Sequence, residues 1–251
     1  MEKSTLAVIA TLSVCLLSTN ANSASFDCKE ATTWVEKAIC ESTELSNLDE
    51  AMAKKHINNL TDADNDEDRE IYKDNAVIDQ KLWLTFQRNT CKDTKCLIRE
   101  YKEYIADKTY TDWNDEIGFS VLPDKNAFGE FSQTSQISIY NSGAQRWEDA
   151  GEATNTVSIH DVANKPYLSI IEGVFVFTNA HTCEIETSKA TWSQNHWVIN
   201  ESQQDETVEL RLYPATYQDK YQLLLKDVDN KYRELHCGMR GYFDGIVLDR
   251  E

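Results

Sequence analysis

Glycine and proline are scarce in this chain and missing from its first half. All eight glycines and all three prolines of the 251 residues occur from Gly118 onward. These two residues are the strongest local interrupters of a helix, so nothing of that kind breaks the segment before Gly118. A long second hydrophobic run is also lacking after the N-terminal one. We therefore expect no membrane-spanning helix beyond the N-terminus.

Sequence signatures of catalysis are missing as well. The chain has no G-x-S-x-G nucleophile motif, no G-x-G-x-x-G motif and no phosphate-binding loop. The 43 aspartates and glutamates could supply the paired carboxylates of a glycoside hydrolase, but no pair stands out from the rest. We predict no catalytic residue and no cofactor, and we favour a binding protein over an enzyme.

Basic residues are few beside acidic ones. The 25 lysines and arginines leave a formal net charge of -18. Such a charge repels nucleic acid and anionic membranes, and it accelerates encounters with a cationic partner. The same acidity also keeps an exported protein in solution, so charge alone does not choose between these roles. The acidic run Asp62–Glu70 lacks the glycine and the final glutamate of a calcium-binding loop, which indicates a solvated charged loop.

The N-terminus has the pattern of a secretory signal. One lysine precedes a hydrophobic run from Leu6 to Leu17, and small polar residues follow. We expect residues 1–25 to form a signal peptide that is cleaved between about residues 21 and 25. The mature protein would then be periplasmic or secreted.

Six cysteines remain once Cys15 leaves with the signal peptide. Four lie in the first half and two in the second: Cys28, Cys40, Cys91 and Cys96, then Cys183 and Cys237. An even number in an exported chain predicts disulfides. If each half closes its own bonds, Cys183 pairs with Cys237. The other four have three possible pairings, and we favour bonds that join the first helical region to the Cys91–Cys96 turn. His181 and His236 beside the last two cysteines offer a zinc set as the less favoured alternative.

The hydrophobic periodicity divides the chain into two parts and predicts an α+β fold. From residue 26 to 108 the pattern is helical and indicates a disulfide-stapled domain of about four short helices. Thr33–Glu36 reads as a capping box that begins the first helix, and Ser46 reads as the start of the second. Later stripes of hydrophobic residues are Ile71, Ile78, Leu82 and Phe86, then Leu97, Tyr101, Tyr104 and Ile105.

The second part alternates with the period of a β-strand. Short alternating segments separated by turn residues recur from residue 126 to 251, after a linker at 109–125. This pattern is typical of an antiparallel β-sandwich or a partly open β-barrel.

The segment Cys237–Gly245 is the densest turn in the chain. It has three glycines within eight residues, which permit a tight loop. Arg240, Tyr242 and Asp244 would project from it, and His181 lies beside the cysteine with which we pair it. Tyrosine and arginine are favoured anchors at protein interfaces, so these four residues are our candidate partner-binding site. The plainer alternative is a closing turn whose Tyr and Phe point into the β core.

The first half resembles a known family. The residues that carry the resemblance are Phe26–Cys28, Glu36–Cys40, Glu44–Glu50, Gln80, Trp83–Leu84, Arg88–Asn89, Cys91, Cys96–Leu97 and Tyr101. Together they resemble the LprI-type lysozyme-inhibitor domain over about residues 25–108. The second half looks like a β module that often follows this domain, through Ala180–Glu184 and Cys237–Gly245. The resemblance implies an exported inhibitor of lysozyme-like muramidases.

Our leading hypothesis is therefore an exported binding protein that occludes the cleft of a lysozyme-like cell-wall hydrolase. The partner would be a cationic hydrolase, either a host lysozyme or a toxin that a competitor delivers to the periplasm. The alternatives are a structural or metal-binding envelope protein and, less favoured, an envelope glycan hydrolase.

Overall fold

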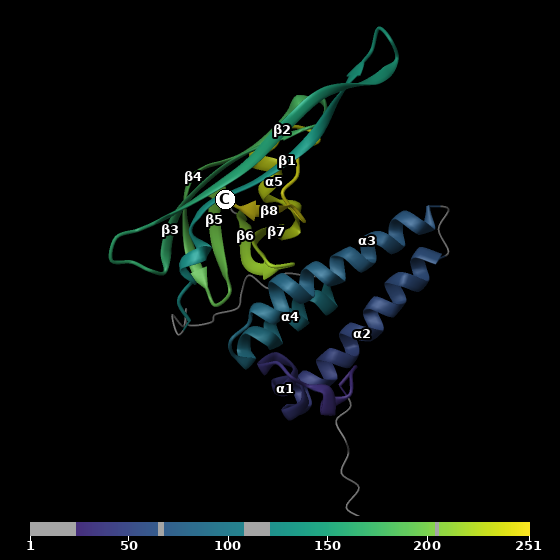
Figure 1. The fold of residues 1–251 in the computed structure, drawn as a ribbon, viewed down its shortest axis with the longest axis vertical. Helices are drawn as coiled ribbons and strands as arrows, with labels where there is room; N and C mark the ends of the chain where they lie inside the picture. The colour runs from purple at the N-terminus through teal and green to yellow at the C-terminus, as the bar shows by residue number, and fades with distance from the viewer. Residues whose placement is uncertain (1–23, 65–67, 108–120, 204–205) are drawn as a thin grey trace, which may run out of the picture.

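The computed structural model describes residues 24–64, 68–107, 121–203 and 206–251. The expected signal peptide, most of the expected linker and the middle of the acidic run lie outside these ranges. The described chain is α+β, with helices first and a closed antiparallel barrel of eight strands after them (Figure 1). No described helix is both long enough and hydrophobic enough to cross a membrane.

The elements follow one another in a simple order. The helices are α1 (Trp34–Glu41), α2 (Thr43–Asp64), α3 (Arg69–Leu82), α4 (Thr94–Ala106) and α5 (Tyr232–His236). The strands are β1 (Gly129–Asn141), β2 (Arg146–Asp161), β3 (Leu168–Phe177), β4 (His181–Ser193), β5 (His196–Gln203), β6 (Glu206–Tyr217), β7 (Lys220–Asp227) and β8 (Val247–Arg250). A short π-helical segment, Trp83–Gln87, continues α3.

The beginning of α1 confirms the predicted capping box. The Thr33 side chain accepts a hydrogen bond from the Glu36 amide at 3.2 Å, and the Glu36 carboxylate accepts one from the Thr33 amide at 2.8 Å. Two amides that the helix itself leaves without partners are thereby satisfied.

Our prediction that the second helix starts at Ser46 is wrong, because α2 begins at Thr43 and runs for 22 residues. The Ser42 hydroxyl accepts from the Leu45 amide at 3.3 Å and so caps this helix. The hydroxyl of Ser46 instead donates to the Ile39 carbonyl at 2.7 Å and ties α2 to α1.

The stripe predicted on the third helix is only partly buried. Phe86 is fully buried, but Ile71 and Ile78 are 62% and 51% exposed. The far ends of α2 and α3 extend together away from the other helices (Figure 1), so the first turns of α3 have few other elements to pack against. The stripe of α4 is closer to the prediction, since Leu97 and Tyr101 are fully buried.

A buried carboxylate organises the helical part. Asp49 of α2 is fully buried and accepts a hydrogen bond from the Tyr101 hydroxyl of α4 at 2.6 Å. Its other oxygen accepts from the amide and hydroxyl of Ser25, at 2.8 and 2.6 Å. A buried carboxylate requires such partners, and these join three separate segments of the chain.

The disulfides are Cys28–Cys40, Cys91–Cys96 and Cys183–Cys237. The pairing of Cys183 with Cys237 is confirmed. The bonds we favoured between the first helical region and the Cys91–Cys96 turn are wrong, because each pair closes locally. Residues 28–30 form a short 3-10 turn in contact with α1, where Cys28 meets Cys40. Asp93 caps α4, and the first turn of that helix brings Cys96 beside Cys91.

The β part is a closed barrel, so the predicted sandwich or partly open barrel is wrong. Each strand pairs with its neighbour in sequence, and β1 pairs with β8 through Phe131 with Arg250 and Ser132 with Asp249. The closing strand β8 has only four residues, which is too short to stand out as an alternating pattern. The interior is filled by hydrophobic side chains such as Phe131, Phe175 and Trp197.

The helical part docks against the barrel through a hydrophobic and a polar contact. Phe86 packs with Tyr213 and Leu224 of the barrel in a separate buried cluster. Beside it, Arg211 of β6 donates to the carboxylate of Glu103 in α4 at 2.7 Å, and both side chains are buried.

Candidate protein-binding surface

The Cys183–Cys237 disulfide fixes the base of the predicted binding loop. A Cβ atom at Gly241 would lie 2.3 Å from the Cys183 sulfur, so only glycine lets the loop pack on this disulfide. The Gly238 amide donates to the Thr182 carbonyl at 2.8 Å and holds the loop beside β4. The loop therefore has little freedom at its base.

Tyr242 and Phe243 point in different directions. Phe243 is fully buried and packs edge to face against Phe175, with ring centroids 5.3 Å apart. Tyr242 is 46% exposed and lies against Phe177 at 4.7 Å. The closing-turn interpretation therefore fits Phe243, while Tyr242 remains available to a partner.

Three of the four predicted site residues lie around this disulfide. Arg240 and Tyr242 are exposed, and Met239 between the glycines is 87% exposed. His181 is half-buried at the start of β4, where its Nδ1 lies near Gly238. Exposed tyrosine, arginine and methionine on a fixed loop are the composition enriched at protein interfaces.

Asp244, the fourth predicted residue, belongs to a different feature. It lines a cleft of about 310 Å³ between the helical part and the barrel, and its Oδ1 accepts from the Asp227 amide at 3.1 Å. The acidic residues along this cleft are Asp79, Glu103, Asp107, Asp227, Asp229 and Asp244. The sequence could not place them together, because they come from both halves of the chain.

Two carboxyls of this cleft have perturbed acidity. Burial raises the pKa of Asp79 above its ordinary value, and the nearby Asp244 carboxylate adds to the shift. Burial also raises the pKa of Asp227, although hydrogen bonds from the Arg233 and Tyr232 amides oppose it. Such perturbed carboxyls are enriched at functional sites.

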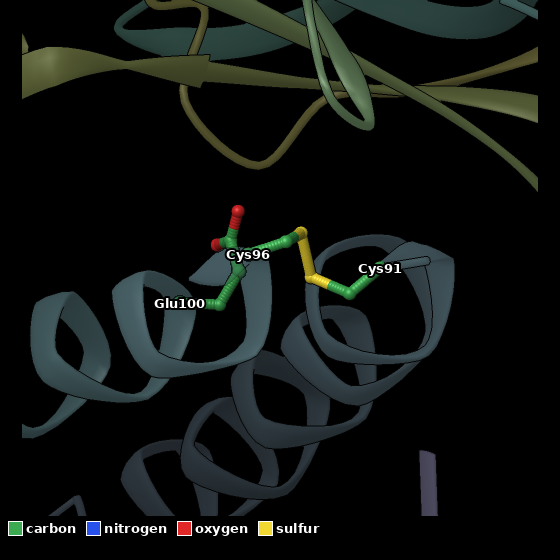
Figure 2. A group of neighbouring side chains, drawn as sticks. All are labelled: Cys91, Cys96 and Glu100. Atoms are coloured by element: carbon green, nitrogen blue, oxygen red, sulfur yellow. A yellow bond between two sulfur atoms is a disulfide. The ribbon is translucent and has the colours of Figure 1, made fainter. Parts of the chain in front are cut away.

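Two groups of metal-ligating residues lack available thiolates. Figure 2 shows Cys91, Cys96 and Glu100 close together, but the two sulfurs are bonded to each other and the Glu100 carboxylate accepts from Arg99 at 2.8 Å. In the second group, Cys183 and Cys237 are likewise bonded. A disulfide sulfur cannot serve as the thiolate ligand that zinc requires.

Sequence reasoning missed another exposed hydrophobic group. Tyr140 of β1 and Trp147 of β2 face each other across the strand pair and are 44% and 50% exposed. The alternating residues around Tyr140 predicted a β-strand. The sequence does not indicate which face of that strand other elements would leave exposed.

Comparison of this chain with family models, with curated proteins and with solved structures finds no match. The resemblance to the LprI-type domain therefore stays a prediction from the quoted residues.

Proposed function

We propose that this chain is an exported binding protein that inhibits a lysozyme-like cell-wall hydrolase by occluding its cleft. The observation that carries the proposal is the loop held by the Cys183–Cys237 disulfide, from which Met239, Arg240 and Tyr242 are exposed. A loop already fixed in one conformation loses little entropy on binding, which favours affinity.

The charge supports the choice of partner. A chain with a net charge of -18 attracts cationic proteins, and it associates with them faster at low ionic strength. Three disulfides fit an oxidising compartment, so we place the protein in the periplasm or outside the cell. A host lysozyme and a competitor's periplasmic toxin both fit these properties.

A turbidity assay tests this proposal. Purified protein is added to purified cationic lysozymes, and the clearing of a cell-wall suspension is followed. We expect at least one lysozyme to be slowed, and the double variant Arg240→Ala/Tyr242→Ala to be a weaker inhibitor. Tyr72→Ala is the matched control, because Tyr72 is 50% exposed on α3, in the helical part rather than in the barrel loop. If no lysozyme of the panel is slowed, the proposal is wrong, whether or not one of them binds.

The acidic cleft supports a second candidate, an envelope glycan hydrolase. A glycosidase needs two carboxyls in a cleft, one of them with a raised pKa, and Asp79 and Asp244 lie in such a cleft. Release of soluble fragments from purified peptidoglycan, lost in the Asp79→Asn variant, would establish this activity. Unchanged peptidoglycan after prolonged incubation with the wild-type protein would remove it.

The structure weakens the metal-binding alternative, because the predicted zinc ligands His181, Cys183, His236 and Cys237 are not all available to a metal. Two of these four ligands, Cys183 and Cys237, are bonded to each other. A third, His236, pairs with Glu201 at 2.9 Å.

A further inference from the structure

The outer part of the β1–β2 hairpin extends beyond the strand pairing that closes the barrel. Residues 133–141 of β1 and 146–155 of β2 pair with each other. The pairing of β1 with β8 stops at Ser132, and that of β2 with β3 begins at Thr156. Within the described chain, residues 133–155 thus form a two-stranded extension that projects past the other strands (Figure 1). We call this segment the outer ribbon.

In the described chain, side chains rather than further strand pairing brace the outer ribbon. The Asn179 side chain accepts from the Tyr140 amide at 2.7 Å, and the Asn155 side chain accepts from the Val176 amide at 2.8 Å. At the tip, the Asn141 side chain accepts from the amides of Gly143 and Ala144, both at 3.0 Å. A ribbon alone is marginally stable, so these bonds hold it in one shape.

A β-bulge sets the direction of the tip. The register between β1 and β2 shifts after Ile137, which faces Gly151, while Ser138 faces Asp149. Gly151 has a φ of +91° and donates to the Asp149 side chain at 2.8 Å. A bulge of this kind bends and twists a strand pair, so the tip has an orientation of its own.

Each face of the tip carries at least one large exposed hydrophobic side chain. Tyr140 and Trp147 form an edge-to-face pair with centroids 5.4 Å apart on one face. Ile139, the preceding residue in β1, points to the other face and is 44% exposed. The aromatic pair supports the ribbon itself, but that role does not require both faces to carry large exposed hydrophobic side chains.

The charge of the outer ribbon is acidic. Residues 133–155 contain Glu148, Asp149 and Glu152 and one basic residue, Arg146. Arg146 is already paired with Glu148 at 3.1 Å. A partner surface that contacts the ribbon is therefore best matched by basic residues around a hydrophobic hollow.

We infer that the outer ribbon is the element that enters the concave surface of a cationic partner protein, with Trp147 and Tyr140 as its anchors. A narrow extension can bury both of its faces only in a hollow, and the substrate cleft of a muramidase is such a hollow. This inference rests on the proposed function for the class of partner. It extends that function by naming a segment that enters the partner, in addition to the contact proposed for the Cys237–Gly245 loop.

The test compares variants for binding and for inhibition separately. Trp147→Ala, Tyr140→Ala and Ile139→Ser are titrated against a panel of purified cationic lysozymes by calorimetry, and each is also used in the lysis assay. Ile139→Ser leaves the aromatic pair intact, so it reports on contact even if Trp147→Ala loosens the ribbon. The matched control is Tyr72→Ala, with similar exposure on α3. We expect Trp147→Ala to weaken binding by about tenfold or more, and Ile139→Ser to weaken it by a smaller factor.

The outcomes separate the two proposals. If all three ribbon variants bind and inhibit like the wild type, the ribbon inference is wrong and the proposed inhibition stands. If the wild type binds a lysozyme without slowing it, and Trp147→Ala loses that binding, the ribbon inference stands and the proposed inhibition is wrong. If the wild type binds no member of the panel, both are wrong.

Discussion

Individual buried polar residues determine how the helices dock on the barrel. Asn195 accepts from Arg99 at 3.0 Å and donates to the Gln87 carbonyl at 3.1 Å, while Arg211 holds Glu103. These partners are separated by 96 to 108 positions in the sequence. No local pattern links residues so far apart, so sequence reasoning identified the helices and strands but not the residues that join them.

Arg211 gives the sharpest stability test at this scale. Replacing it by alanine leaves the Glu103 carboxylate buried without its guanidinium, which we expect to lower the free energy of unfolding by about 3–5 kcal/mol. The control is Arg146→Ala, which breaks an exposed pair with Glu148 and should cost about 1 kcal/mol or less. Urea denaturation measures both. If both variants lost the same free energy of unfolding, the Arg211–Glu103 pair would not behave as a buried ion pair.

His196 predicts how stability depends on pH. The imidazole is fully buried, and burial together with Arg99 and Arg211 holds its pKa well below the ordinary 6.5. The unfolded chain therefore takes up the proton first. The neutral His196 imidazole therefore contributes to the free energy of unfolding above about pH 6.5. This contribution is lost as the pH falls towards the pKa of His196 in the folded chain.

The variant His196→Gln isolates this effect. We expect the urea midpoint of the wild type to fall more steeply than that of the variant as the pH is lowered below about 6.5. Parallel curves for the two proteins would show that the imidazole titrates alike in both states.

Elements defined by adjacent residues were the most predictable. The capping box of α1 needs only four consecutive residues, and it was found where the sequence placed it. The exposed faces of α3 were not predictable, because burial there depends on which other elements lie nearby. The β-strand pattern was recognisable for the same local reason, but closure of the barrel depends on the four-residue β8 meeting β1.

The capping box of α1 provides a prediction for an element. Thr33→Ala removes the side chain that accepts from the Glu36 amide and should cost about 1 kcal/mol of stability. Lys37→Ala, in the same helix, is the control and should have a smaller effect. Thermal or urea unfolding measures both variants, and a loss no larger than that of the control would count against the cap.

The carboxyl of Glu36 reports on the same cap. Hydrogen bonds from the Thr33 and Thr32 amides lower its pKa to about 2. The cap therefore stabilises the chain above pH 4.5 and weakens as the pH falls towards 2. An NMR titration of the Glu36 carboxyl should show a midpoint near 2 in the wild type. A midpoint near 4.5 would mean that the cap is not formed.

At the scale of the whole molecule, the chain is both cross-linked by disulfides and strongly acidic. The barrel is closed, the helical part has two disulfides and the barrel part has one. The outer ribbon and the Cys237–Gly245 loop each expose large hydrophobic side chains, as α3 does. The Cys237–Gly245 loop was predictable from the sequence, because its cysteine and its three glycines lie close together in the chain. The ribbon was missed because its exposure follows from where neighbouring strands end.

The disulfides should differ in their effect on the whole molecule. Cys183–Cys237 closes 54 residues, whereas Cys91–Cys96 closes five. By loop entropy, the double variant Cys183→Ala/Cys237→Ala should lose about 4 kcal/mol and Cys91→Ala/Cys96→Ala about 2 kcal/mol. Chemical denaturation without reductant compares them, and a larger loss for the short loop would contradict the entropic argument.

The measurement that tests the central proposal most directly is a lysis titration at several salt concentrations. Increasing amounts of the wild-type protein are added to a fixed amount of a cationic lysozyme. We predict that lysis is suppressed near equimolar protein at low salt. The inhibition should weaken as salt rises, because the Debye length falls from about 10 Å at 0.1 M to about 3 Å at 1 M. Lysis rates that stay unchanged at excess protein and low salt, across all the lysozymes of the panel, would contradict the account.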